Sequence, residues 1–181
     1  MKRNIPDIDI YTWDEVNVIC KKLIALIDKP FDVIVCIMRG GAVPGVIIAN
    51  ELGIDEVIAI KIVQDGQRKG ANPSEDTGEP GVYRAEKGVV LVPLNDFNLK
   101  GKRVLVVDDV LDSGQSIKTA LNEIHKQRPA DVKLAVMQKK TYSQIEPDYC
   151  VETRTNWLFY PWMSLRELEE MKKNLARKAR P

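Results

Sequence analysis

The stretch Val104-Leu-Val-Val-Asp-Asp-Val-Leu-Asp-Ser-Gly-Gln-Ser116 decides the fold class of this 181-residue chain. Its apolar, mostly β-branched beginning predicts a strand, and the Asp-Ser-Gly turn near its end predicts that a helix begins at Ser116. An uninterrupted apolar run is typical of a strand that is covered on both faces, as in a parallel sheet. The stretch therefore predicts a strand–loop–helix unit of an α/β protein.

The same alternation of strand and helix extends in both directions from this unit. Apolar runs predict strands at 33–37, 57–62, 89–92, 103–107, 132–137 and 148–151. Apolar spacing, with capping boxes at 12–15 and 164–167, predicts helices at about 13–28, 44–52, 116–127 and 164–180. We expect one domain, residues 1–181, with a mostly parallel, twisted sheet flanked by helices.

One long segment does not fit this alternation. Residues 64–87 carry several glycines and prolines among charged and polar residues. Such a composition excludes a packed helix or a central strand, and a loop of this length in a compact domain is usually functional or disordered. We interpret the segment as a mobile lid.

Composition narrows the functional classes. The net charge of +1 gives no general electrostatic argument for a nucleic-acid partner. No apolar run is long enough to span a bilayer, and the polar beginning of the chain is unlike a signal peptide. Cys20, Cys36 and Cys150 are widely spaced, which argues against a disulfide framework and fits the cytoplasm. The only histidine, His125, lies on a predicted helix, where we interpret it as a surface residue, and this disfavours histidine triads and multi-histidine metal sites.

The loop after the strand at 103–107 carries the chemistry. In open parallel sheets, ligands bind beyond the carboxyl ends of the strands, where Asp108 and Asp109 stand. The turn at 112–116 then offers free N–H groups and a helix N-terminus, which favour a phosphate. Because carboxylates repel phosphate, the two acids must serve vicinal hydroxyls or a hydrated Mg²⁺. The alternative is an ordinary surface turn with a helix cap, but the buried strand before it favours a site.

Three motifs carry a family resemblance. The stretch 104–116 resembles the signature of the type I phosphoribosyltransferases. The loop Met38-Arg-Gly-Gly-Ala-Val-Pro-Gly45 resembles the pyrophosphate-binding loop of xanthine-guanine phosphoribosyltransferases, and Trp157-Leu-Phe-Tyr-Pro-Trp162 resembles their purine-binding segment. The motifs follow the family order between residues 33 and 162. The resemblance implies the type I phosphoribosyltransferase fold, with a lid at about 64–87 and a small purine-binding hood at about 139–163.

For the sugar, the resemblance implies a set of phosphoribosyl pyrophosphate contacts. Asp108 and Asp109 would hold the ribose hydroxyls, with Mg²⁺ nearby, bound through the substrate and water rather than by protein ligands. The catalytic Asp112 would assist proton removal at the purine N7. The Arg39–Gly40 loop would bind pyrophosphate after a cis peptide. The 5′-phosphate would lie on the turn Ser113, Gly114, Gln115 and Ser116.

For the base, the resemblance implies that Lys140 donates to the 6-oxo group, Trp157 flanks the ring and the Leu158 carbonyl meets position 2. Lys139 remains an alternative to Lys140. Met163 stands where relatives often carry an acid, and no catalytic residue of the lid is identified. The implied activity is the transfer of phosphoribose to xanthine, guanine or hypoxanthine in purine salvage. The resemblance also implies a homo-oligomer, and we expect a dimer.

Two other functions are compatible with the same fold class. A regulator that senses phosphoribosyl pyrophosphate and binds nucleic acid could use the same fold. The near-neutral charge and the lack of a winged-helix segment disfavour it. A pyrimidine transferase is a third possibility, which the segment beginning at Trp157 disfavours. We therefore expect small-molecule substrates and neither a nucleic-acid nor a membrane partner.

Overall fold

The computed structural model describes residues 7–64, 88–92, 94 and 97–178. Apart from Gln64, the segment expected to form a lid lies outside the described residues. Within the described part of the chain, no helix is long and apolar enough to cross a membrane.

The main sheet confirms the predicted α/β class. Its strand order is β4-β3-β2-β5-β6-β7, and every neighbouring pair is parallel except β3–β4 at one edge. Each predicted strand is present, although several extend beyond their predicted bounds. The strands are β2 (Val33–Met38), β3 (Val57–Gln64), β4 (Gly88–Val92), β5 (Arg103–Leu111), β6 (Asp131–Lys140) and β7 (Tyr149–Arg154).

Strand β5 is longer than the sequence predicted, and this extension matters for the site. We expected the strand to end at Val107, but it continues through both acids to Leu111. The reason is its neighbour β6, which supplies ladder partners as far as the pair Leu111–Lys139. Pairing with a long neighbour outweighs the low strand propensity of aspartate. Asp108 and Asp109 therefore belong to the strand itself and not to a loop after it.

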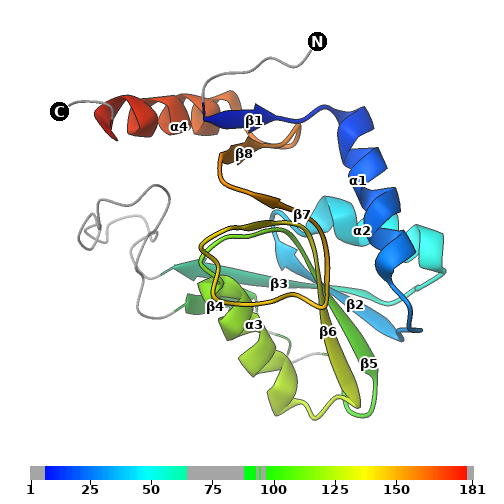
Figure 1. Ribbon diagram of the computed structural model, residues 1–181. Helices are drawn as coiled ribbons and strands as arrows, with labels where there is room; N and C mark the ends of the chain where they lie inside the picture. The colour runs from blue at the N-terminus through cyan, green and yellow to red at the C-terminus, as the bar shows by residue number, and fades with distance from the viewer. Residues whose placement is uncertain (1–6, 65–87, 93, 95–96, 179–181) are drawn as a thin grey trace.

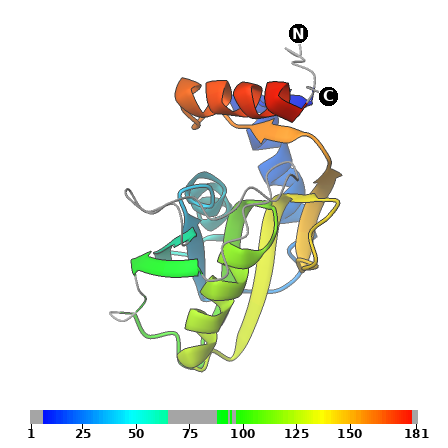
Figure 2. The same cartoon turned by 90° about the vertical axis from the view of Figure 1, so that its left-hand side faces the viewer.

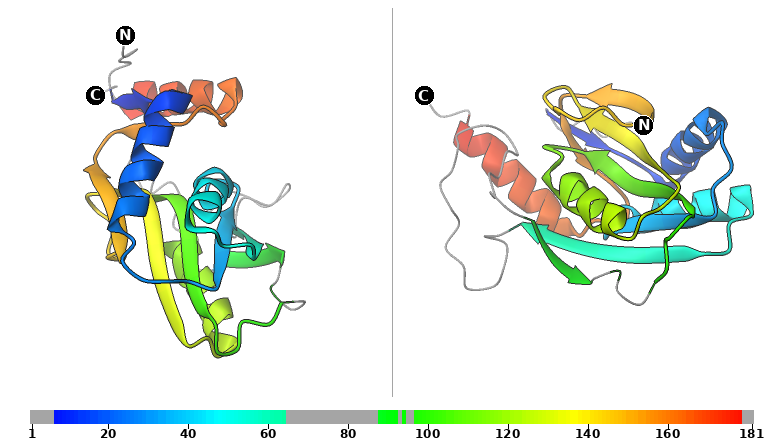
Figure 3. Two further views of the ribbon diagram at one scale, coloured as in Figure 1. Left: turned by 90° about the vertical axis from the view of Figure 1, so that its right-hand side faces the viewer. Right: turned by 90° about the horizontal axis from the view of Figure 1, so that it is seen from below.

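Three helices cover the two faces of the main sheet (Figures 1 and 3). On one face, α1 (Trp13–Leu26) and α2 (Ala42–Leu52) pack on a core that includes Leu23, Ile48 and Val107. On the other face, α3 (Gln115–Lys126) packs on Val106 and Val136. It begins one residue before the predicted Ser116, because Gly114 is the N-cap.

A small cap layer, made of β1 (Ile8–Ile10), β8 (Trp157–Phe159) and α4 (Leu165–Lys178), lies beyond the main sheet (Figure 2). Strands β1 and β8 form a separate two-stranded parallel sheet. Ile8, Phe159 and Met171 bury its apolar side against α4. The cap layer therefore joins the N-terminal region to the segment expected to bind a purine.

Candidate active site

A glycine loop ends β2 and packs directly against the end of β5. The peptide bond between Met38 and Arg39 is cis, as the resemblance predicted. A Cβ atom at Gly40 would lie 2.3 Å from Oδ1 of Asp109, and one at Gly41 would lie 2.2 Å from the carbonyl oxygen of Val107. Only glycine allows this approach, so both glycines serve to bring the loop against the acid pair.

A cavity of about 540 Å³ opens beside this loop. Its walls come from the ends of β2, β3 and β5 and from the start of α4. It carries two cations and two acids among apolar side chains. The lining residues are Met38, Arg39, Gly40, Val43, Lys61, Ile62, Asp109, Trp162, Met163 and Glu167. The sequence patterns gave Lys61 and Glu167 no ligand-binding role, and they included Trp162 only as the last residue of the segment that resembles a purine-binding segment.

The acid pair is held in an environment that resists ionisation. Burial, and then the charge of Asp109, raise the pKa of Asp108 well above its usual value. Burial also raises the pKa of Asp109 to about 6, although the Val110 N–H donates to its carboxylate at 2.7 Å. The Trp162 side chain gives Asp109 a further hydrogen bond. A cation or a set of hydroxyl donors would relieve the cost of the charged pair.

The turn from Asp112 to Ser116 leads directly into the N-terminus of α3. Gly114 has a φ of 86°, in the left-handed region that favours glycine, and caps the helix without a side-chain hydrogen bond. No acidic residue lies in the first turn of α3. The Gln115 N–H reaches the Ser113 hydroxyl at only 3.5 Å. The turn therefore has the backbone donors and the positive helix end that bind phosphate.

Asp112 lies on the side of this turn that faces the end of β6. The Tyr142 hydroxyl donates to Asp112 Oδ1. Burial raises the pKa of Asp112, whereas the bond from Tyr142 and the charge of Lys140 lower it. Tyr142 was not predicted as a site residue, because nothing in the spacing of residues 112 and 142 indicates that they meet.

The two neighbouring lysines at the end of β6 point to different surroundings. The Lys140 ammonium is buried and donates to the carbonyl of Asn156, and burial lowers its pKa. The Lys139 ammonium instead pairs with Glu146, at 2.5 Å. Lys140 is thus the lysine that lies with Asp112 and with the residues just before β8.

In strand β8, the backbone groups of Trp157 and Leu158 point in opposite directions. Tyr11 N–H donates to the carbonyl of Phe159, and Trp157 N–H donates to that of Asp7, each at 2.9 Å. Because alternate residues of a parallel strand bond to the same neighbour, the backbone of Leu158 points away from β1. Trp157 is half-buried and packs with the apolar cluster under α4. The Trp157 ring therefore contributes to the apolar core of the cap layer.

A stack of aromatic rings packs against Trp162, which lines the cavity. Tyr160 lies between Tyr11 and Trp162, with ring centroids 5.4 Å and 4.7 Å away. Its hydroxyl donates to the buried Gln138 and approaches the Asp109 carbonyl at 3.5 Å. Trp162 also contacts Trp13 at 6.0 Å. The stack fixes Trp162, which in turn donates to Asp109.

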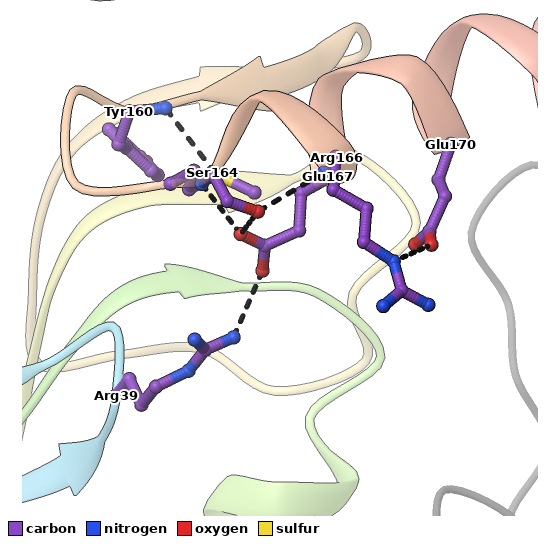
Figure 4. Close-up of polar contacts among 7 residues, drawn as sticks. Arg39, Tyr160, Ser164, Arg166, Glu167 and Glu170 are labelled. Atoms are coloured by element: carbon purple, nitrogen blue, oxygen red, sulfur yellow. Dashed lines mark hydrogen bonds and ion pairs between the residues drawn. The ribbon is translucent and has the colours of Figure 1, made fainter.

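An ion pair joins the glycine loop to the cap layer. The guanidinium of Arg39 reaches up to Glu167 in the first turn of α4, and Nη2 lies 3.0 Å from Oε1 (Figure 4). Glu167 is also the N3 residue of the predicted capping box, whose bonds to Ser164 are present. Residue spacing identified the capping role but not the pairing with Arg39.

The metal-binding capacity of the site is limited to carboxylates. Among the described residues, no group of three or more histidine, cysteine or acidic side chains could hold a metal ion. Asp108 and Asp109 nevertheless fit a hydrated Mg²⁺, because Mg²⁺ keeps several waters, through which nearby carboxylates can hold it while it binds the phosphates of a substrate.

A parallel sheet with a cis-peptide glycine loop, an acid pair and a helix N-terminus at its strand ends defines an α/β protein that binds phosphorylated ligands. The sequence model of a protein family, the phosphoribosyl transferase domain, matches residues 9–160 of this chain. The chain belongs to this family of enzymes, as the resemblance predicted.

Individual relatives resemble the chain over most of its length. A xanthine-guanine phosphoribosyltransferase of Vibrio parahaemolyticus is 28% identical, over 88% of this chain and 92% of the relative. The purine phosphoribosyltransferase from Pyrococcus horikoshii is 28% identical, with a TM-score of 0.73 over 88% of this chain and 96% of its own. A hypothetical protein from Neisseria gonorrhoeae with bound ppGpp is 23% identical, with a TM-score of 0.71 over 97% of this chain and 99% of its own; this likeness shows the fold alone.

Proposed function

We propose that the protein transfers 5-phosphoribose from phosphoribosyl pyrophosphate to an oxopurine, namely xanthine, guanine or hypoxanthine. One observation carries the proposal: the end of β5 connects two polar clusters. Asp109 lies against Gly40 in the cavity, and Asp112 lies beside Tyr142 and Lys140. A substrate with an anionic leaving group at one end and a base at the other matches this arrangement.

At the base, Lys140 would donate to the 6-oxo group, and the Leu158 carbonyl would lie at position 2, where it can accept from the 2-amino group of guanine. Adenine has an amino group at position 6, which cannot accept from an ammonium, so the site would favour oxopurines. Asp112 would accept the proton from N7. As N9 bonds to C1 of the ribose, the bond from C1 to the pyrophosphate oxygen breaks, and pyrophosphate leaves with the electron pair.

At the sugar, the backbone donors of 113–116 and the Ser113 and Ser116 hydroxyls would hold the 5′-phosphate. Asp108 and Asp109 would accept from the ribose hydroxyls. The Arg39–Gly40 loop would hold the pyrophosphate. Fixing both anionic ends places C1 near the base, which is the main contribution that positioning makes to such a displacement.

Mg²⁺ would be held near Asp108 and Asp109 through water and the substrate oxygens. When bound, it supplies charge neutralisation for the leaving pyrophosphate. The raised pKa values of both acids support a cationic partner, because a cation stabilises their charged forms.

We also propose that the protein acts as a homodimer in the cytoplasm. Trp13, Val18 and Val46 are between 51% and 53% exposed on α1 and α2, and association of two copies would cover such apolar surface. The three free cysteines are compatible with a reducing compartment. Light scattering at several concentrations tests the dimer.

The activity is tested by incubating the protein with Mg²⁺, phosphoribosyl pyrophosphate and one base at a time, and by measuring pyrophosphate release. We expect release with at least one of xanthine, guanine and hypoxanthine, and little with adenine or uracil. Release with uracil alone, or with none of the bases, would overturn the proposal.

A further inference from the structure

Glu167 is fixed in place by its own helix. Its Oε2 accepts from both the N–H and the hydroxyl of Ser164, each at 2.8 Å. Partial burial raises the pKa of Glu167, but the bonds from Ser164 and the charge of Arg39 outweigh burial and lower it overall. The carboxylate is therefore charged and cannot follow a moving partner.

Arg39, in contrast, is loosely held. Its side chain is 76% exposed, and within the described residues the guanidinium is held by the single bond from Nη2 to Glu167 Oε1. Figure 4 shows the rest of the guanidinium turned away from the carboxylate. A bond through one nitrogen orients a guanidinium much less than a two-pronged pair does. Arg39 can therefore leave Glu167 for another anion.

The charges of the cavity conflict with an anionic occupant. Arg39 and Lys61 are the cations among its lining residues, and Asp109 and Glu167 are the acids. In the unliganded protein, Glu167 neutralises Arg39, which leaves Lys61 as the cation of the cavity without a paired acid among the described residues. The ion pair therefore lowers the net positive charge that the cavity offers to an entering diphosphate.

We propose that Glu167 is an internal counter-ion that competes with the diphosphate group for Arg39 and thereby weakens the cavity's hold on that group. The inference rests on the proposed function of the Arg39–Gly40 loop. Glu167 acts through Arg39 and does not touch the reacting atoms, so it is a positioning residue. Its effect is to favour release of pyrophosphate after transfer.

The main test is Glu167→Gln, measured on the full chain with magnesium pyrophosphate by calorimetry. Glutamine preserves the N3 position of the capping box, so α4 keeps its first turn while the charge is lost. We expect the Kd for magnesium pyrophosphate to fall about three- to fivefold, the size typical of an exposed ion pair. The KM for phosphoribosyl pyrophosphate should fall as well, while the KM for the base stays unchanged.

Glu170→Gln is the matched control. Glu170 lies one turn further along α4 and pairs with Arg166 at 3.0 Å, outside the cavity lining. This variant removes the same charge from the same helix and should leave the Kd unchanged. A fall of equal size in Glu170→Gln would mean that net charge alone is responsible, and would overturn the proposal.

A double-mutant cycle with Arg39→Ala separates this inference from the function on which it rests. We expect Arg39→Ala to weaken binding of magnesium pyrophosphate, and Glu167→Gln to change the Kd less than twofold in that background. Unchanged or weaker binding in Glu167→Gln alone, or a full effect without Arg39, would refute the role of Glu167. Unchanged binding in Arg39→Ala alone would instead refute the proposed diphosphate loop.

Discussion

Gly40 and Asp109 are so close that a single methyl group on the glycine would lie 2.3 Å from the carboxylate oxygen. The contact joins two segments that carry different parts of the proposed reaction. Gly40 belongs to the loop after β2, and Asp109 belongs to β5. Any side chain at position 40 must displace either the acid or the loop.

We therefore predict that Gly40→Ala raises the KM for phosphoribosyl pyrophosphate about tenfold or more, because the methyl group moves Asp109 or the loop out of position. Gly53→Ala is the control. Gly53 ends α2 with a φ of 64°, and a Cβ there meets no atom within 4 Å. Its replacement should lower the melting temperature but leave the KM unchanged. Equal kinetic effects in both variants would contradict the assigned contact.

The acid pair predicts a conflict between stability and binding. Burial raises the pKa of Asp109 to about 6. Burying the neutral carboxyl therefore carries no charge penalty below about pH 4, where it is protonated in both the folded and the unfolded state. As the pH rises through 6, the folded protein must hold a buried charge, and its free energy of unfolding falls. Asp108→Asn with Asp109→Asn should therefore raise stability at pH 8 by roughly 1–2 kcal/mol, and the gain should shrink toward pH 4. Thermal unfolding at both pH values measures it.

The same double variant should bind phosphoribosyl pyrophosphate at least tenfold more weakly, because it loses the proposed acceptors for the ribose hydroxyls and the partner for Mg²⁺. Calorimetry with Mg²⁺ present checks this, and circular dichroism confirms an intact fold. Wild-type affinity in the variant would remove both acids from the proposed sugar site.

Tyr142 predicts a pH effect on catalysis. Its hydroxyl donates to Asp112 and lowers the pKa of that carboxyl. Tyr142→Phe should raise the pKa, so the acidic limb of kcat/KM should move up by about half to one pH unit. Tyr149→Phe removes a similar bond to Asp28, at 2.8 Å, far from the cavity lining. An identical shift in both variants, or none in Tyr142→Phe, would disprove the link to Asp112.

The two lysines at the end of β6 give a paired test of base recognition. Lys140→Ala should raise the KM for oxopurines at least tenfold, because the donor for the 6-oxo group is lost. Lys139→Ala removes only the partner of Glu146 and should change the KM less than twofold. The reverse order would assign the base to Lys139. Initial rates with varied hypoxanthine distinguish the two.

Local patterns predicted most of the fold because they report local physics. The apolar runs marked each strand of the main sheet, and the capping boxes at Thr12 and Ser164 both formed. Strands β1 and β8 escaped notice because each has three residues, too few for a periodic signal. The end of β5 was predicted too early because its polar residues are held by pairing with β6, which sequence spacing does not show.

The candidate site was predictable where the motifs are contiguous and unpredictable where the contacts are distant. Asp109 and Gly40 were identified from their own motifs. Glu167 was identified only as a capping residue, because its partner Arg39 is 128 positions away. Lys61 lies within an ordinary strand pattern and faces the cavity only because β3 pairs with β2, where Lys61 is opposite Met38.

The central claim is that the end of β5 serves both the diphosphate and the base. A crystal structure with magnesium, phosphoribosyl pyrophosphate and an unreactive oxopurine analogue tests it most directly. We predict the diphosphate against Gly40 and Arg39, the 5′-phosphate on the turn 113–116, and the base between Lys140 and Leu158. A diphosphate bound away from Gly40, or a base away from Lys140, would contradict the account.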